Sequence, residues 1–99
     1  MARPIKGSNK DVTTAGTAVA LSATSLLVSS VTIEAKATNT GVIYVGSSTV
    51  SSADNDGLAA TESINWESDE NTGTIDLAAQ YIDSSVNGEG VNIWYVEAQ

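Results

Sequence analysis

Carboxylates are the main groups through which this 99-residue chain could do chemistry, because it contains neither histidine nor cysteine. Their absence removes the commonest general base near neutral pH and every thiol nucleophile or zinc–thiolate site. A hydrolase would need a carboxylate pair or a Ser–Lys pair. Carboxylates stand close together at Asp54 and Asp56 and at Glu67, Asp69 and Glu70. Because both groups lie among Gly, Ser and Asn residues, which favour turns, we interpret them as solvated loop residues and expect no enzyme.

Residues 54–57, Asp-Asn-Asp-Gly, are similar to the opening of a calcium-binding loop. An EF-hand loop has ligands at positions 1, 3, 5 and 12 and glycine at position 6. Here the glycine comes at position 4 and position 12 is Asn65, so the EF-hand pattern fails. An irregular calcium site formed by Asp54, Asp56 and Glu62 stays open as an alternative, and we expect no other metal or cofactor.

Charge is distributed unevenly along the chain, whose formal net charge is −8. Residues 1–36 hold all four cations and have a balance of +2, whereas residues 37–99 hold ten acids and no cation. An acidic body repels nucleic acid and anionic membranes, so we expect neither as a partner. A basic leader on an acidic body predicts that the leader docks on an acidic surface such as a neighbouring copy, with three interface candidates: Arg3, Lys6 and Lys10.

The uncharged residues 15–33, preceded by basic residues, have some likeness to a signal peptide or a membrane span. Serine and threonine interrupt this run, and its second half alternates between polar and apolar residues. We therefore expect strands here.

Short strands dominate the predicted structure. Residues 26–37 show the clearest period of two, with Val31, Ile33 and Ala35 on one face and Thr32 and Glu34 on the other. Further strands are predicted at 17–21, 42–45, 58–60, 63–66, 81–82 and 91–96, with a helical turn at 76–80 and hairpin turns at 39–41 and 87–90. This pattern predicts an all-β fold, a small antiparallel β-sandwich or barrel of jelly-roll type, over residues 17–99. Residues 1–16 show no period and are predicted to form an extended arm.

The last predicted strand is apolar on both faces. Val91, Ile93 and Tyr95 lie on one face and Trp94 and Val96 on the other. This pattern indicates a central strand, or a strand whose outer face is covered by a partner. Because a sandwich buries only one face of each strand, we expect the second face to be covered by another copy or another partner. Trp94 and Val96 are therefore interface candidates, and the alternative is that Trp94 faces the core. We expect two further aromatic residues, Tyr44 and Tyr81, in the core.

Several segments resemble a family of short, β-rich structural proteins of tailed bacteriophages. They are Gly-Thr-Ala-Val-Ala-Leu at 16–21, Ser-Val-Thr-Ile-Glu-Ala at 30–35, Asn-Thr-Gly-Val-Ile-Tyr-Val-Gly at 39–46, Asp-Leu at 76–77, Tyr-Ile-Asp at 81–83 and Asn-Gly-Glu-Gly-Val at 87–91. The likeness covers most of residues 16–96. It departs from the family at Thr61, where family members often have glycine before a Glu-Ser pair.

The resemblance implies a structural virion protein on the outer capsid surface. Its expected role is that of a cement or decoration protein that binds and stabilises the shell. The expected partners are the major capsid protein and further copies of the chain, as a dimer or trimer. The alternatives are a receptor- or glycan-binding module of a tail or head fibre, and a head–tail or tail component.

Overall fold

A computed structural model describes residues 4–68 and 74–98. These residues form eight strands and one short 3₁₀ helix: β1 (Lys6–Val12), β2 (Val19–Ala20), β3 (Leu27–Ala35), β4 (Ile43–Gly46), β5 (Ser63–Glu67), β6 (Ile75–Asp76), η1 (Leu77–Ala79), β7 (Tyr81–Ser84) and β8 (Glu89–Glu97). The predicted helical turn at 76–80 therefore corresponds to η1, and it leads into β7 as expected.

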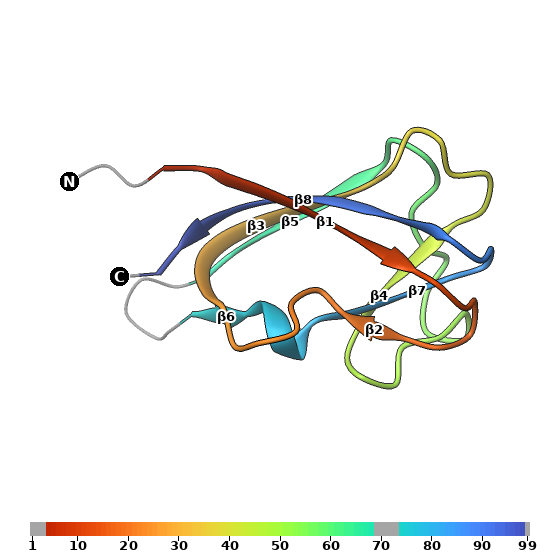
Figure 1. Cartoon of the computed structure of the whole chain (residues 1–99), viewed down its shortest axis with the longest axis horizontal. Coiled ribbons are helices and arrows are strands. Elements are labelled where there is room, and N and C mark those ends of the chain that lie inside the picture. The colour runs from red at the N-terminus through yellow and green to blue at the C-terminus, as the bar shows by residue number, and fades with distance from the viewer. Residues whose placement is uncertain (1–3, 69–73, 99) are drawn as a thin grey trace.

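The strands form two antiparallel sheets, which lie above and below a shared core (Figure 1). The large sheet has the order β1-β8-β3-β5, with β6 also paired to β3, and the small sheet has the order β2-β7-β4. An isolated bridge between Ile43 and Leu58 adds to the free side of β4. The predicted all-β, antiparallel fold is confirmed. The first strand pairs with the last and the second with the seventh.

The core is aliphatic and draws on both sheets. Ile33 is fully buried on β3, where it faces Ile93 of β8 and Ile64 of β5 in register. The small sheet contributes the fully buried Ile43 and Ile82. The predicted alternation of β3 is confirmed, since Val31, Ile33 and Ala35 are buried and Thr32 and Glu34 are not.

The expectation that Tyr44 and Tyr81 are core residues is wrong. Both are half-buried, and neither belongs to the core cluster. In β4 and β7 the inward positions are taken by Ile43, Val45 and Ile82. Tyr44 lies between Ile43 and Val45, and Tyr81 directly precedes Ile82, so both tyrosines point to the opposite face.

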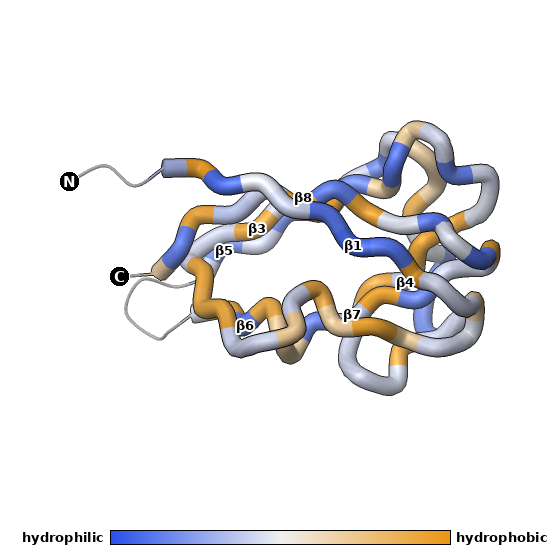
Figure 2. The backbone as a smooth tube through the Cα atoms, in the orientation of Figure 1, coloured by the Kyte–Doolittle hydropathy of each residue, from blue (hydrophilic) through white to orange (hydrophobic). Residues whose placement is uncertain are grey.

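Part of the predicted N-terminal arm belongs to the domain. Residues 6–12 are extended, but they form β1, which pairs with β8 in seven consecutive registers. Val12 at the end of β1 is fully buried in the core. Figure 2 shows why the sequence did not reveal the strand: β1 is mostly hydrophilic, because an edge strand exposes most of its side chains. The division at residue 16 therefore has to be moved towards the N-terminus.

The two predicted hairpin turns join the sheets instead of forming hairpins. Residues 39–41 connect β3 of the large sheet to β4 of the small one, and residues 87–88 connect β7 to β8. Asn39 is buried, and its amide donates to the Gly90 carbonyl at 2.8 Å and accepts from the Gly90 N–H at 3.3 Å. The two connections are thereby held against each other.

Residues 15–33 contain β2 and most of β3, as the alternation predicted. Within the described residues, no helix is long and apolar enough to cross a membrane.

Candidate interaction surfaces

The large sheet carries an apolar patch on the face that points away from the core. Three residues form this outer patch: Ile5, which is 73% exposed, Trp94, which is 42% exposed, and Val96, which is half-buried. With Ser30, Thr32 and Tyr95 they line a shallow hollow of about 240 Å³. Trp94 therefore lies on the second face of β8, and the alternative that it faces the core is wrong.

Strand register determines what surrounds Trp94. Trp94 lies opposite Thr32 on β3 and opposite Gly7 on β1, which has no side chain to cover the ring. The Asn65 amide donates to Thr32 Oγ1 at 2.6 Å, so a neutral polar rim borders the patch. This surface offers hydrophobic contact and neutral hydrogen-bonding groups.

The predicted basic candidates lie along β1, except Arg3, which falls outside the described residues. Lys6 Nζ lies 2.9 Å from Glu97 Oε1, and this hydrogen bond and the attraction of the carboxylate raise the pKa of Lys6. Lys10 is half-buried opposite Val91. The structure thus keeps Lys6 and Lys10 on one edge strand, separate from the Trp94 side of the sheet.

A further ion pair crosses β8 next to these lysines. Lys36 Nζ lies 2.8 Å from Asp11 Oδ1, although β8 separates their strands. Gly90 of β8 lies beneath this pair, and a Cβ there would collide with Asp11 and with the Lys10 carbonyl oxygen. Glycine is therefore required at this position by the close approach of β1.

The calcium candidates do not come together. Asp54 Oδ2 accepts the Ser51 N–H at 3.0 Å, and Glu62 Oε1 accepts the Ala59 N–H at 2.8 Å, so both carboxylates close local turns. The described part of the chain contains no group of three or more acidic side chains placed to hold a metal ion. The positions of Asp54, Asp56 and Glu62 therefore give no support to an irregular calcium site.

Other carboxylates hold loops in place. Asp76 accepts hydrogen bonds from the backbone of Ala78 and Leu26 and from the Ser25 hydroxyl, and these bonds lower the pKa of Asp76. Glu89 accepts from the N–H groups of Thr40 and Gly41, which likewise lowers the pKa of Glu89. Both side chains are acceptors that stabilise connections between strands. Of the other acids in the predicted pairs, Glu67 is exposed, whereas Asp69 and Glu70 lie outside the described residues.

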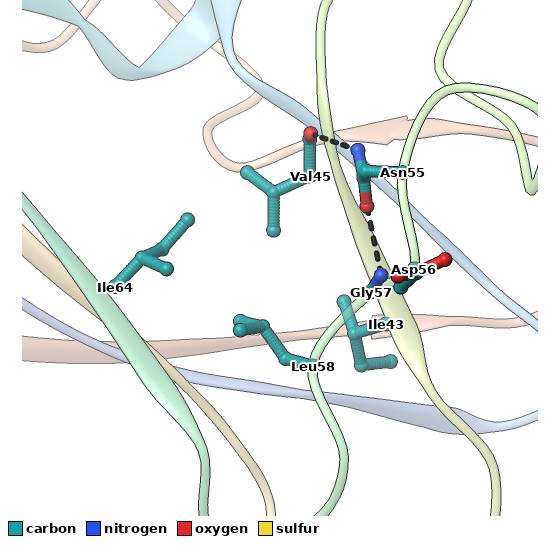
Figure 3. Close-up of a pocket in the computed structure, with 7 residues that line it drawn as sticks. All are labelled: Ile43, Val45, Asn55, Asp56, Gly57, Leu58 and Ile64. Atoms are coloured by element: carbon teal, nitrogen blue, oxygen red, sulfur yellow. Dashed lines mark hydrogen bonds between the residues drawn. The ribbon is translucent and has the colours of Figure 1, made fainter.

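A pocket of about 270 Å³ lies between the edges of the two sheets (Figure 3). Its walls are apolar and come from β4, β5 and the connection between them: Ile43, Val45, Leu58 and Ile64. The Asn55 side chain donates to the Val45 carbonyl at 3.3 Å and accepts from the Gly57 N–H at 2.9 Å, which fixes the loop at the rim. Asp56 adds a carboxylate there. Sequence reasoning missed this pocket because β4 and β5 belong to different sheets, and the local sequence does not show which sheet receives each strand.

No family model matches the chain, and neither a curated protein nor a solved structure matches it. The functional argument therefore rests on the surfaces themselves and on the sequence resemblance given above.

Proposed function

We propose that the protein is a structural component of a tailed-phage virion that binds the outer capsid surface as a cement or decoration protein. The resemblance of residues 16–96 to small virion proteins is the starting point. The observation that carries the proposal is the outer patch of Ile5, Trp94 and Val96 on the large sheet. An exposed apolar patch with a polar rim is typical of a protein interface, and tryptophan is enriched among the residues that dominate binding.

The proposed partner is the major capsid protein. A ligand that binds only the assembled shell stabilises that shell by linkage, so attachment through the patch would make the capsid harder to disrupt. The acidic remainder of the chain suits a surface that faces solvent, because net charge opposes nonspecific association.

Capsids that lack the protein provide the test. The wild-type chain should co-sediment with them and raise their thermal disruption temperature. Trp94→Ala should weaken binding about tenfold or more, because the ring is the largest side chain in the patch. Val86→Ala removes an apolar group that is 38% exposed outside the patch and serves as the matched control. Equal binding by the two variants would contradict the assignment of the patch.

A glycan-binding module of a fibre is the second candidate. It is favoured by the position of the Trp94 ring beside Thr32 and near the Asn65 amide, because sugars stack on aromatic rings and hydrogen-bond to neighbouring polar groups. A panel of soluble host-surface glycans separates the two candidates. Binding to a glycan with no binding to capsids, both measured with the same wild-type sample, would favour the fibre module. A head–tail or tail component would instead show a low copy number in particle images.

A further inference from the structure

The large sheet has two open edges of opposite character. Its order places β1 at one edge and β5 at the other. In the described part of the chain, β1 pairs only with β8 and β5 only with β3, so one side of each backbone has no strand partner. Unpaired edges are templates for pairing with another chain, and many proteins protect them.

The hydrogen bonds show which backbone groups point outward. In an antiparallel ladder, the N–H and C=O of one residue point to the same neighbour, and successive residues alternate. The Glu62 carbonyl, just before β5, accepts from the Ala35 N–H, and the Ser68 N–H, just after β5, donates to the Ser29 carbonyl. Both residues at the ends of β5 that bond to β3 are even-numbered, so the even-numbered residues of β5 also bond to β3. Ser63, Asn65 and Glu67 therefore point to the open side.

The same reasoning applies to β1. The Gly90 carbonyl accepts from the Lys36 N–H, and the Gly90 N–H donates to the Asn39 side chain, so both backbone groups of Gly90 point to the β3 side. Because successive residues alternate, the odd-numbered residues of β8 bond to β1. These residues lie opposite Lys6, Ser8 and Lys10. The groups of β1 that point to the open side are consequently those of its odd-numbered residues: Gly7, Asn9 and Asp11.

Charge distinguishes the two edges. β1 carries Lys10 and Lys6 on one face, and Lys6 is paired with Glu97 of β8. The only acid of β1, Asp11, is paired with Lys36, so Lys10 is the charge that β1 offers to a partner. β5 has Glu62 immediately before it and Glu67 at its end, and residues 37–99 contain no cation that could neutralise them. β5 also exposes Trp66, which is 39% exposed. Lysine and proline, the residues that commonly protect an edge, are absent from β5.

We propose that the β1 edge of one copy pairs with the β5 edge of a second copy, so that the large sheet continues from one molecule into the next. Each strand of the sheet is antiparallel to its neighbour, and therefore β1 and β5 of one copy run in opposite directions. A second copy added in the same orientation thus presents β1 antiparallel to β5. The charges of the two edges favour this pairing over β1 with β1 or β5 with β5.

One register satisfies both the backbone and the side chains. This register places Lys10 opposite Glu62. Asn9 then lies opposite Ser63, and Gly7 opposite Asn65. The backbone N–H and C=O groups of these last two pairs point to the open sides of their strands, so they can bond to each other. On the core side of the sheet, Ser8 then lies opposite Ile64. Lys6 lies opposite Trp66, a cation–π arrangement.

The pocket of Figure 3 borders this junction. Ile64 is part of its wall and Asp56 lies at its rim, so the hollow leaves room for the core-side lysine side chains of the added strand beside a further carboxylate. Strand addition beside a side-chain pocket is a recurrent mode of recognition, in which the backbone gives affinity and the pocket gives specificity.

Such a contact joins two different surfaces, so it generates a ring or an open filament and does not stop at a dimer. The inference does not depend on capsid binding, because it concerns the isolated protein.

Sedimentation velocity over a concentration series tests the proposal on the purified chain. The wild type should form species larger than dimers, which decrease as salt is added. Lys10→Glu and Glu62→Lys each place like charges opposite each other, and each variant alone should raise the dissociation constant about fivefold. A mixture of the two variants should restore association. Two kinds of contact alternate in the mixture. In one, the acid introduced at position 10 of the first variant faces the lysine introduced at position 62 of the second. In the other, the native Lys10 of the second variant faces the native Glu62 of the first.

Two controls keep this result specific. Thr24→Lys adds a cation in the exposed loop between β2 and β3, outside β1, β5 and the pocket, and should leave association unchanged. Glu62→Gln keeps an oxygen to accept the Ala59 N–H, so it separates loss of charge from loss of the local turn. Circular dichroism establishes that each variant is folded.

Cross-linking tests the register, because the chain has no native cysteine. Asn9→Cys mixed with Ser63→Cys should give a heterodimer with a short bis-maleimide, whereas Asn9→Cys mixed with Ser48→Cys, which lies in an exposed loop, should not. The proposal is overturned by a wild type that remains monomeric at every concentration. Failure of the mixture to restore association would also overturn it. So would a result in which Trp94→Ala abolishes association while the edge variants Lys10→Glu and Glu62→Lys retain it, because Trp94 lies on the face of the sheet and not at its edges.

Discussion

Two neighbours on β8 should respond in opposite ways to truncation. Ile93 is 1% exposed and lies in the core opposite Ile33, whereas Trp94 is 42% exposed on the outer patch. Alanine at either position leaves the backbone of a central strand unchanged. Any difference between the two variants therefore reports which face of the strand contributes to folding.

The magnitudes follow from the two environments. Ile93→Ala loses transfer free energy of about 0.8 kcal/mol for each buried CH₂-sized group and leaves a cavity. Together these effects cost about 2–5 kcal/mol, a large part of the roughly 5–15 kcal/mol that stabilise a typical domain. For a chain of this size the midpoint of thermal unfolding should fall by roughly 10–25 °C. Trp94→Ala changes a side chain that is 42% exposed on the surface of the sheet and leaves no cavity in the core, so it should cost about 1 kcal/mol or less.

Thermal and urea unfolding followed by circular dichroism measure both variants under one set of conditions. An unchanged dependence on urea would show that the comparison concerns the native state and not the denatured one. Equal losses of stability in the two variants, or a larger loss in Trp94→Ala, would refute the assignment of the faces and with it the outer patch.

Three further predictions concern the edges and connections. Thr61 has φ 71°, a conformation that glycine adopts freely and a β-branched residue does not, so Thr61→Gly should raise stability by about 1 kcal/mol in urea unfolding despite the added chain entropy. A destabilised variant would contradict this. Because hydrogen bonds lower the pKa of Glu89 in the folded state, its contribution is present above the unfolded pKa of about 4.3 and is lost as pH falls through the folded pKa. Glu89→Gln should therefore be less stable than the wild type at pH 7, with a difference that shrinks in acid; a gap independent of pH would exclude this linkage. Deleting residues 1–12 removes β1 and the buried Val12, so the midpoint of thermal unfolding should fall and light scattering should reveal aggregation, whereas an unchanged midpoint would mean that β1 is dispensable.

The strands that could be predicted are those with one buried face. In β3 the alternation of Val31, Ile33 and Ala35 with polar residues follows directly from burial on one side. The apolar run of β8 correctly indicated a central strand, since β8 lies between β1 and β3. Burial on one face leaves a period of two in the sequence, and that period is local information.

Other features depend on partners that are distant in the chain. β1 has the sequence Lys-Gly-Ser-Asn-Lys-Asp-Val and only Val12 is buried, so no period reveals it. The turns at 39–41 and 87–90 were recognised as turns, but turn residues do not show which sheet receives the next strand. Asn39 illustrates the difference: its role is to bond the backbone of Gly90, 51 residues away. The outer patch was predicted at Trp94 and Val96 but not at Ile5, which joins it only through the pairing of β1 with β8.

The proposed capsid contact and the proposed contact between copies use different parts of one sheet. The outer patch lies on the face of the large sheet, whereas β1 and β5 are its edges. A sheet that lies face-on against a shell directs its edges along the surface, towards neighbouring copies. Both contacts can then form at once, and each bound copy would raise the local concentration of a complementary edge.

Capsid binding by the wild type should accordingly be cooperative. Lys10→Glu should bind with the same intrinsic affinity and less cooperativity, whereas Trp94→Ala should lose affinity and still associate with itself. Binding isotherms on capsids, compared with sedimentation of the free protein, distinguish these outcomes. Equal cooperativity in Lys10→Glu and the wild type would show that the edges do not meet on the shell.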